Sequence, residues 1–220
     1  INLGTSIMQI SARTPASAAM HAIATDYLSN GRLILGVGVS GPQVVEGWYG
    51  QPYPKPLART REWVQIFRQI VSRDEPVAFD GEHYQLPLKG GTGLGKPLKL
   101  MQHPIRDHIP LYLGAEGPKN VALSAEICDG WIPMFLSPYR MHNQYEDAMR
   151  IKAPGFEIAA AVPVVIDGDV DKARSQIKQN VGFYVGGMGA KTFNVHKDHV
   201  GRMGYGDAAE KIQDLFMSGK

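Results

Sequence analysis

The feature that most constrains this chain is a regular alternation of short apolar runs with longer amphipathic segments. Residues 32–39 (RLILGVGV) and 109–114 (IPLYLG) are apolar runs bounded by turn residues, which is typical of buried strands. Between them, residues 57–72 place Trp63 and Phe67 in an apolar stripe at helical spacing. Strands that alternate with helices predict a parallel sheet covered by helices.

The alternation extends along the whole chain. Further strands are predicted at residues 1–10, 130–135 and 156–166. Further helices are predicted at residues 16–28, 118–127, 139–149, 170–184 and 207–217. The last helix is expected to bury Ala208, Ile212, Leu215 and Phe216. Residues 41–56 are predicted to form a loop rich in Gly, Pro and aromatic residues.

One segment interrupts this pattern. Asp80-Gly81 lies in the middle of residues 77–86 and is a strong hairpin signal, and a Gly/Pro-rich loop follows up to residue 106. We therefore interpret residues 77–108 as an insertion within a single domain that spans residues 1–220.

The order of elements is compatible with a doubly wound sheet and with a (β/α)8 TIM barrel, both of the α/β class. A closed barrel needs eight units and about 250 residues. The chain has five recognisable units in 220 residues and begins and ends abruptly. We therefore expect a barrel whose N-terminal units and final strand are absent from this chain.

Composition excludes several classes of partner. The chain has 23 basic and 21 acidic residues, a balance that predicts no attraction to nucleic acid or to an anionic membrane. Its longest apolar run, near residues 158–166, is far shorter than the roughly 20 residues of a membrane helix. The only cysteine, Cys128, cannot form an internal disulfide and is expected to be buried. This favours a cytoplasmic protein.

Two glycine-rich motifs resemble nucleotide-binding loops. Residues 36–41 match G-x-G-x-x-G after a strand, but Pro42 and a long loop follow in place of the phosphate-binding helix. A glycine-lined loop at the carboxyl edge of a barrel strand fits better. Residues 90–96 match G-x-x-x-x-G-K, but Pro97 stands where a Mg²⁺-binding Ser or Thr is needed, so a mobile loop is favoured.

A third segment is more informative. Gly114 and Gly117 follow a predicted strand, and Pro118 begins a helix. Free N–H groups and the helix dipole would favour an anion there, although a plain strand-to-helix turn has the same pattern. His196 and His199 lie three residues apart without a metal-binding motif, so we interpret them as structural or surface residues and predict no metal site.

Together these segments resemble the luciferase-like superfamily, in particular its actinobacterial F420-dependent oxidoreductases. The matching stretches are LGTSIMQISARTPASAAMHA, GRLILGVGVSGPQVVEGWYG, PLARTREWVQIFRQI, FDGEHYQLP, IPLYLGAEGPKNVALSAEICDGWIP and VGGMGA. The resemblance implies a TIM barrel, a cytoplasmic homodimer, and transfer of a hydride between coenzyme F420 and a small-molecule substrate. It also implies a bulged strand with a non-proline cis peptide beside the coenzyme ring.

The resemblance implies three groups of coenzyme-binding residues. The ring system would face the first strand end at Ser6, Ile7 and Gln9. The ring and ribityl chain would lie along Val39, Ser40, Gly41 and Pro42. The coenzyme phosphate would bind at Gly114, Ala115, Glu116 and Gly117.

The resemblance leaves the catalytic residues unknown. Related sugar-phosphate dehydrogenases carry a catalytic Glu at the position of Gly41, so sugar-phosphate oxidation is not expected. The His and Trp that those enzymes also use would lie before Ile1. Two alternatives stay open: an FMN-dependent luciferase-like monooxygenase, and a degenerate flavin-binding relative without catalytic activity.

Overall fold

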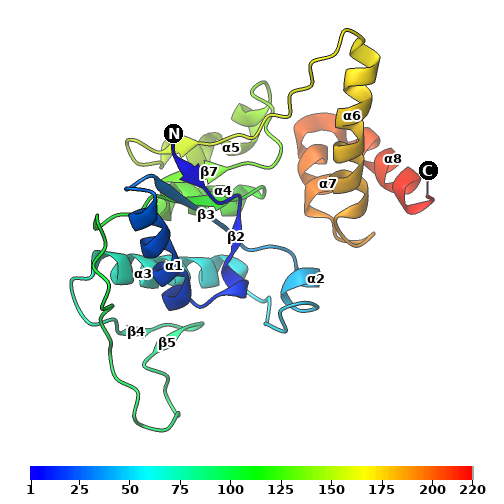
Figure 1. The fold of residues 1–220 in the computed structure, drawn as a ribbon. Coiled ribbons are helices and arrows are strands. Elements are labelled where there is room, and N and C mark those ends of the chain that lie inside the picture. The colour runs from blue at the N-terminus through cyan, green and yellow to red at the C-terminus, as the bar shows by residue number, and fades with distance from the viewer. Residues whose placement is uncertain (220) are drawn as a thin grey trace.

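A curled parallel sheet forms the centre of the molecule. The computed structural model describes residues 1–219, without the side chains of residues 142 and 143. The sheet has six strands in the order β1-β3-β6-β7-β8, and β2 also pairs with β3. Helices cover its outer face, as Figure 1 shows. The predicted α/β class with a parallel, barrel-like sheet is therefore confirmed.

The elements follow the predicted order. The strands of the sheet are β1 (Leu3–Gly4), β2 (Met8–Gln9), β3 (Leu33–Gly38), β6 (Leu111–Gly114), β7 (Gly130–Ile132) and β8 (Glu157–Ile158). The helices are α1 (Pro15–Leu28), α2 (Pro42–Val45), α3 (Pro56–Ser72), α4 (Pro118–Ile127), α5 (Met141–Arg150), α6 (Val170–Gly182), α7 (Val195–Val200) and α8 (Gly206–Met217). Two π-helical segments, Phe183–Gly187 and Gly201–Tyr205, flank α7. No helix among the described residues has the length and apolar composition needed to cross a membrane.

The core lies between the sheet and its helices. Leu35 and Val37 on β3 are buried beneath the helices, as alternation along a strand requires. The predicted stripe of α3 is confirmed, because Trp63 and Phe67 are buried and stack with ring centroids 5.4 Å apart. Cys128 is also buried, which raises the pKa of its thiol to about 12. Full burial of each large side chain stabilises the fold by about 1.5–3 kcal/mol.

The insertion contains the predicted hairpin. Strands β4 (Phe79–Asp80) and β5 (Gln85–Leu86) pair in antiparallel register. The Glu62 carboxylate of α3 accepts three backbone N–H groups of the connecting turn, from Glu82, His83 and Tyr84, at 2.8–3.0 Å. The loop that follows is tied to α1 and β3 by Arg106, which donates two hydrogen bonds to buried Asp26 of α1 and one to the Leu33 carbonyl of β3.

The first predicted strand is wrong as a continuous element. Gly4 pairs with Ile34 and Met8 pairs with Val37, so four steps along the first segment match three steps along β3. The extra residue is a bulge that divides residues 1–10 into β1 and β2. A non-proline cis peptide joins Ser6 to Ile7 within this bulge, as the resemblance implied.

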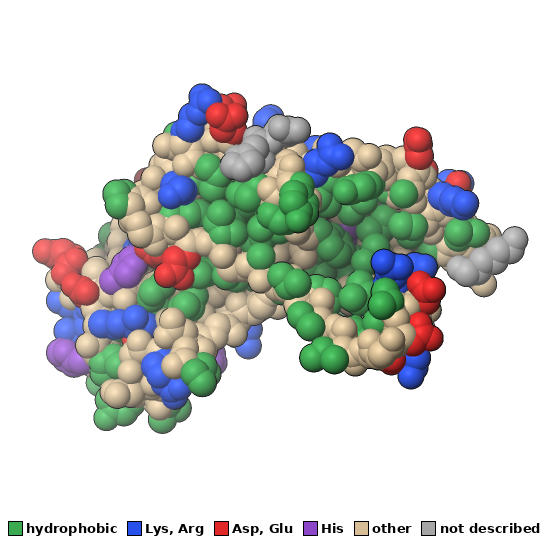
Figure 2. Space-filling view, turned by 90° about the horizontal axis from the view of Figure 1, so that it is seen from above, with side chains coloured by type: hydrophobic (Ala, Val, Ile, Leu, Met, Phe, Trp, Pro, Cys, Tyr) green, Lys and Arg blue, Asp and Glu red, His purple; other side chains and the backbone are tan. Residues whose placement is uncertain are grey.

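The predicted strand at residues 156–166 is wrong beyond Ile158. Pairing ends at β8, and the chain then runs in an extended path toward α6 (Figure 1). Val162 and Val164 are exposed because no described strand or helix covers them. Figure 2 shows hydrophobic side chains spread across the middle of the face seen from above, with a hollow between two lobes.

The C-terminal helices differ most from prediction. Helix α7 falls where no helix was predicted, as does α2 in the earlier loop at residues 41–56. In α8 the buried residues are Ala209 and Gln213, whereas Ala208, Leu215 and Phe216 are exposed and Ile212 is only half-buried. The reason is that α8 packs against the Phe183–Gly187 segment and α7 through a narrow face, which leaves the rest of its apolar stripe open.

Candidate coenzyme site

Three neighbouring strand ends bring the predicted site residues to one edge of the sheet. Gln9 pairs with Gly38, and Gly38 pairs with Gly114, so β2, β3 and β6 end side by side. The loops at residues 39–42 and 115–117 follow β3 and β6 directly. Parallel strands present their carboxyl ends at the same edge, which is where barrels bind their ligands.

Ile7 lies over the ends of β3 and β6. A Cβ atom placed on Gly38 would come within 2.7 Å of Ile7 Cδ1, and one on Gly114 within 3.1 Å of Ile7 Cγ2. Glycine at both positions therefore lets the Ile7 side chain rest against the two backbones. The bulge thus creates an apolar wall at this edge. Nearby, Gln9 Oε1 is buried without a protein partner among the described residues.

The loop at residues 39–42, which follows β3, has a fixed backbone. Ser40 has a positive φ of 60°, and its carbonyl accepts a 3.3 Å hydrogen bond from the Tyr53 hydroxyl. Burial raises the pKa of Tyr53, so the phenol stays protonated and can donate this bond. Gly41 then caps α2, which begins at Pro42. A small cavity beside this loop is lined by Ile10, Ser11, Val39, Val45, Pro52, Tyr53, Pro56 and Arg59.

The loop at residues 115–117, which follows β6, is held by two buried hydrogen-bond donors. Trp131 Nε1 donates to the Ala115 carbonyl at 2.7 Å, and the Tyr145 hydroxyl donates to the Glu116 carbonyl at 2.8 Å. Gly117 is the N-cap of α4 and has open space where a Cβ would lie. The loop therefore keeps a free helix N-terminus with room beside it, which suits an anion.

The Glu116 side chain does not follow the prediction for this loop. Its carboxylate is buried and lies 2.8 Å from His196 Nδ1 on α7, and its second oxygen has no described partner. The carboxylate thus faces α7, so only the backbone of Glu116 is suited to bind a phosphate. The contact between Glu116 and His196 also joins this loop to the C-terminal helices.

His199 takes part in a buried network that the sequence did not predict. Its Nδ1 lies 3.0 Å from the Tyr145 hydroxyl, and its Nε2 lies 2.7 Å from the Phe135 carbonyl. Burial lowers the pKa of His199, even though the Phe135 carbonyl and Glu116 act in the opposite direction. The i, i+3 spacing of His196 and His199 placed both on one helical face, but it gave no sign of their partners.

The side chains of two tryptophans near the candidate loops do not line this edge. Trp131 is fully buried beneath the sheet, and Trp48 is 82% exposed. Tyr53 contacts the loop at residues 39–42 and lines the small cavity. The described residues contain no cluster of three or more side chains able to hold a metal ion.

Comparison with known proteins identifies the family. The model of the luciferase-like monooxygenase family matches residues 1–219. The chain therefore belongs to the luciferase-like monooxygenase family.

Two sequence relatives carry names that mention a coenzyme or substrate. A Mycobacterium tuberculosis protein named "Putative coenzyme F420-dependent oxidoreductase" is 54% identical over the whole of this chain, which spans 66% of that relative. A 5,10-methylenetetrahydromethanopterin reductase of Archaeoglobus fulgidus is 33% identical over 85% of this chain and 54% of its own length. The chain thus spans less than two thirds of the length of these relatives.

Two solved structures share the fold at low identity. A coenzyme F420-dependent tetrahydromethanopterin reductase from Methanopyrus kandleri superposes with a TM-score of 0.70 at 22% identity, over 97% of this chain and 69% of that chain. An F420-dependent secondary alcohol dehydrogenase, solved with an F420-acetone adduct, gives 0.72 at 21% identity, over 97% and 64%. These likenesses support the barrel-type fold.

Proposed function

We propose that this protein is an F420-dependent oxidoreductase that transfers a hydride between the deazaflavin coenzyme and a small organic substrate. The observation that carries the proposal is the junction of β2, β3 and β6, where an apolar wall and a free helix N-terminus share one edge. The 54% identity to the mycobacterial relative supports the choice of coenzyme.

Different residues of the site suit different parts of the coenzyme. Ile7, resting against Gly38 and Gly114, offers a flat apolar surface for the ring system. The unpartnered Gln9 Oε1 is able to accept a hydrogen bond from a polar ring atom. The N-terminus of α4 at Gly117 suits the phosphate. Ser6 and residues 39–42 complete the proposed wall around the ring and ribityl chain.

The coenzyme supplies the chemistry, since a deazaflavin carries two electrons as a hydride. The chain's own residues would bind the coenzyme, orient its ring over the bulge and exclude water from one face. Gly41 offers no acid at the position where related sugar-phosphate dehydrogenases have one. A substrate without a sugar phosphate is therefore part of the proposal.

The test is a fluorescence titration of the purified protein with F420 and, separately, with FMN. The proposal expects micromolar binding of F420 and much weaker binding of FMN. Gly114→Val should weaken F420 binding, because a Cβ at this position already lies 3.1 Å from Ile7 and a branched side chain would displace it. Gly168→Val, at a glycine with open space around it, is the matched control.

Tight FMN binding without an F420 signal would contradict the proposal and favour the monooxygenase alternative. Binding of neither ligand would contradict both the F420 proposal and the FMN alternative. The homodimer and the cytoplasmic location rest on the family resemblance and composition, and the first can be checked by light scattering during size-exclusion chromatography.

A further inference from the structure

Two successive peptide units of the loop after β6 are anchored on the same side. The carbonyl of Ala115 accepts from the Trp131 indole and the carbonyl of Glu116 accepts from the Tyr145 hydroxyl. Both donors are almost completely buried, and their rings pack edge to face with centroids 4.9 Å apart. Trp131 comes from β7 and Tyr145 from α5, so both lie beneath the loop in the layer between sheet and helices.

The anchoring of the carbonyls fixes the direction of the N–H groups. In a trans peptide the C=O and N–H bonds point in opposite directions. The cis peptides of the described chain lie elsewhere, at Ser6-Ile7 and Leu86-Pro87. The N–H groups of Glu116 and Gly117 therefore point away from Trp131 and Tyr145. Within residues 1–219 neither N–H has a protein acceptor.

A flipped loop would be disfavoured by the same contacts. Turning either peptide would present a carbonyl oxygen at the edge where an anion is proposed to bind. Turning the Ala115 peptide would also leave the buried indole N–H of Trp131 without its acceptor, which costs free energy. The Glu116 carbonyl is held by a second donor as well, because Arg202 Nη2 donates to it at 3.3 Å. His199 Nδ1 lies 3.0 Å from the Tyr145 hydroxyl, and His199 Nε2 donates to the Phe135 carbonyl, so the Tyr145 side chain has a fixed neighbour.

We propose that Tyr145 and Trp131 are positioning residues that aim the N–H groups of the loop at the coenzyme phosphate. This inference rests on the proposed function, since it concerns the same site. Neither residue is proposed to touch the coenzyme. Each acts through the peptide unit that it holds, and together they convert an ordinary strand-to-helix turn into a directed anion site.

The test uses two ligands that differ only in the phosphate-bearing tail. F420 and its phosphate-free deazaflavin core, which keeps the ring and the ribityl chain, are titrated into the wild-type protein and Tyr145→Phe, which removes one oxygen atom. The inference expects Tyr145→Phe to weaken F420 binding roughly tenfold, a change of about 1.4 kcal/mol. The affinity for the phosphate-free ligand should change by less than about twofold. Tyr27→Phe, at an exposed tyrosine on α1, is the matched control and should change neither affinity.

A second variant keeps the test decisive if Tyr145→Phe is poorly folded. Trp131→Phe removes the donor to Ala115 and should also weaken F420 selectively. The unfolding midpoint of each variant is measured in parallel. A purely structural role would weaken both ligands equally, and that result would overturn the inference, as would an unchanged ratio of the two affinities.

The failure of this inference is distinguishable from failure of the proposed function. If wild-type protein prefers F420 over the phosphate-free ligand and both variants keep that preference, only the positioning role is overturned. If wild-type protein binds FMN and not F420, or does not distinguish the two deazaflavins, the placement of the phosphate is overturned together with this inference.

Discussion

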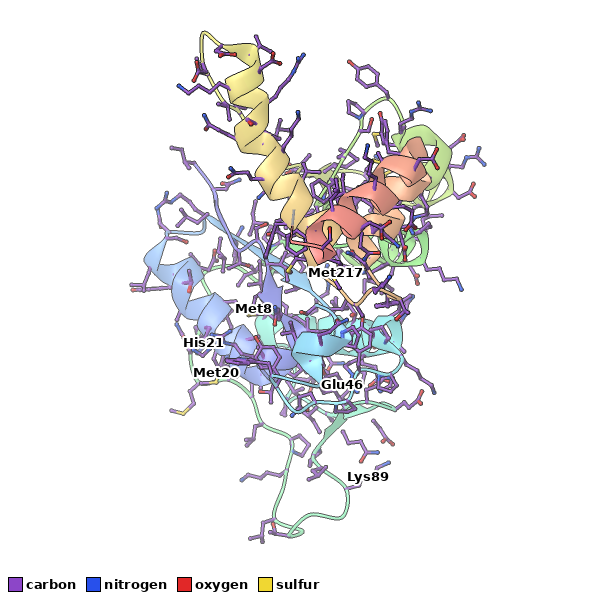
Figure 3. All side chains as sticks on the ribbon, turned by 90° about the vertical axis from the view of Figure 1, so that its right-hand side faces the viewer. Met8, Met20, His21, Glu46, Lys89 and Met217 are labelled. Carbon is purple, nitrogen blue, oxygen red and sulfur yellow. The ribbon has the colours of Figure 1, made fainter. Side chains whose placement is uncertain are left out.

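The insertion and the C-terminal helices are two additions to the same sheet, and different chemistry holds each of them. The hairpin is tied by carboxylates: Glu62 accepts three backbone N–H groups and Asp26 binds Arg106. The C-terminal helices are tied through His196 and His199. Figures 1 and 3 show the two additions at opposite ends of the molecule, with Lys89 in the loop beyond the hairpin.

The insertion and the C-terminal helices differ in whether their contacts reach the candidate coenzyme site. The hairpin contacts of Glu62 lie at residues 82–84, away from the strand ends that form the candidate site. In the C-terminal addition, His196 contacts Glu116 in the loop that is proposed to bind the coenzyme phosphate. We therefore expect damage to the hairpin contacts to lower stability without altering binding, whereas the C-terminal contacts affect both.

The largest effect is expected from Arg106→Met. The variant leaves the Asp26 carboxylate buried without its charged partner, which typically costs about 3–5 kcal/mol of unfolding free energy. Urea unfolding measures the change, and F420 affinity under folding conditions should stay at the wild-type value. A loss below about 1 kcal/mol would show that this pair does not anchor the insertion.

Glu62→Gln should have an intermediate effect. A neutral amide accepts the turn N–H groups less strongly than a carboxylate, and its NH2 group opposes one of them, so about 1–3 kcal/mol should be lost. Amide exchange in residues 82–84 should accelerate. The control is Glu126→Gln, which breaks an exposed pair with Arg61 and should cost less than about 1 kcal/mol. Equal effects of the two variants would refute the anchoring role of Glu62.

The smallest effect concerns pH and the C-terminal helices. Burial lowers the pKa of His199 below its ordinary value of 6.5, so below that pH the unfolded chain binds more protons than the folded one. Stability should therefore fall as the pH drops through about 6.5, by up to about 1.4 kcal/mol for each unit of pKa difference. Denaturant midpoints across this range measure it.

Variants isolate the contribution of this one group to the pH profile. His199→Gln should reduce the pH dependence relative to the wild type, whereas His21→Gln, at an exposed histidine, should leave it unchanged. An identical slope for His199→Gln and wild type would mean that His199 does not titrate differently in the folded protein.

Most of the sheet and its covering helices could be predicted because their signals are local. The apolar run of β3, the stripe of α3 and the Asp80-Gly81 turn each encode their structure within a few residues. The bulge between β1 and β2 could not be located in this way, because a one-residue excess is defined only by the partner strand.

The site was only partly predictable for a related reason. Gly114 and Gly117 mark a backbone that a ligand can approach, and the strand order brings them to the predicted edge. The anchors of that loop come from far along the chain: Tyr145 lies 29 residues from Glu116 and His199 lies 54 from Tyr145. Polar contacts between such distant residues leave no periodic pattern, so neither anchor was predicted.

The most direct test of the account is to record amide ¹H–¹⁵N spectra of the protein during titration with F420. The largest shifts are expected at Glu116, Gly117 and Lys119, where the helix N-terminus and the preceding loop are proposed to receive the phosphate. The amide of His83 in the distant hairpin should not move. Saturable F420 binding that leaves the three loop amides unchanged would contradict the central claim.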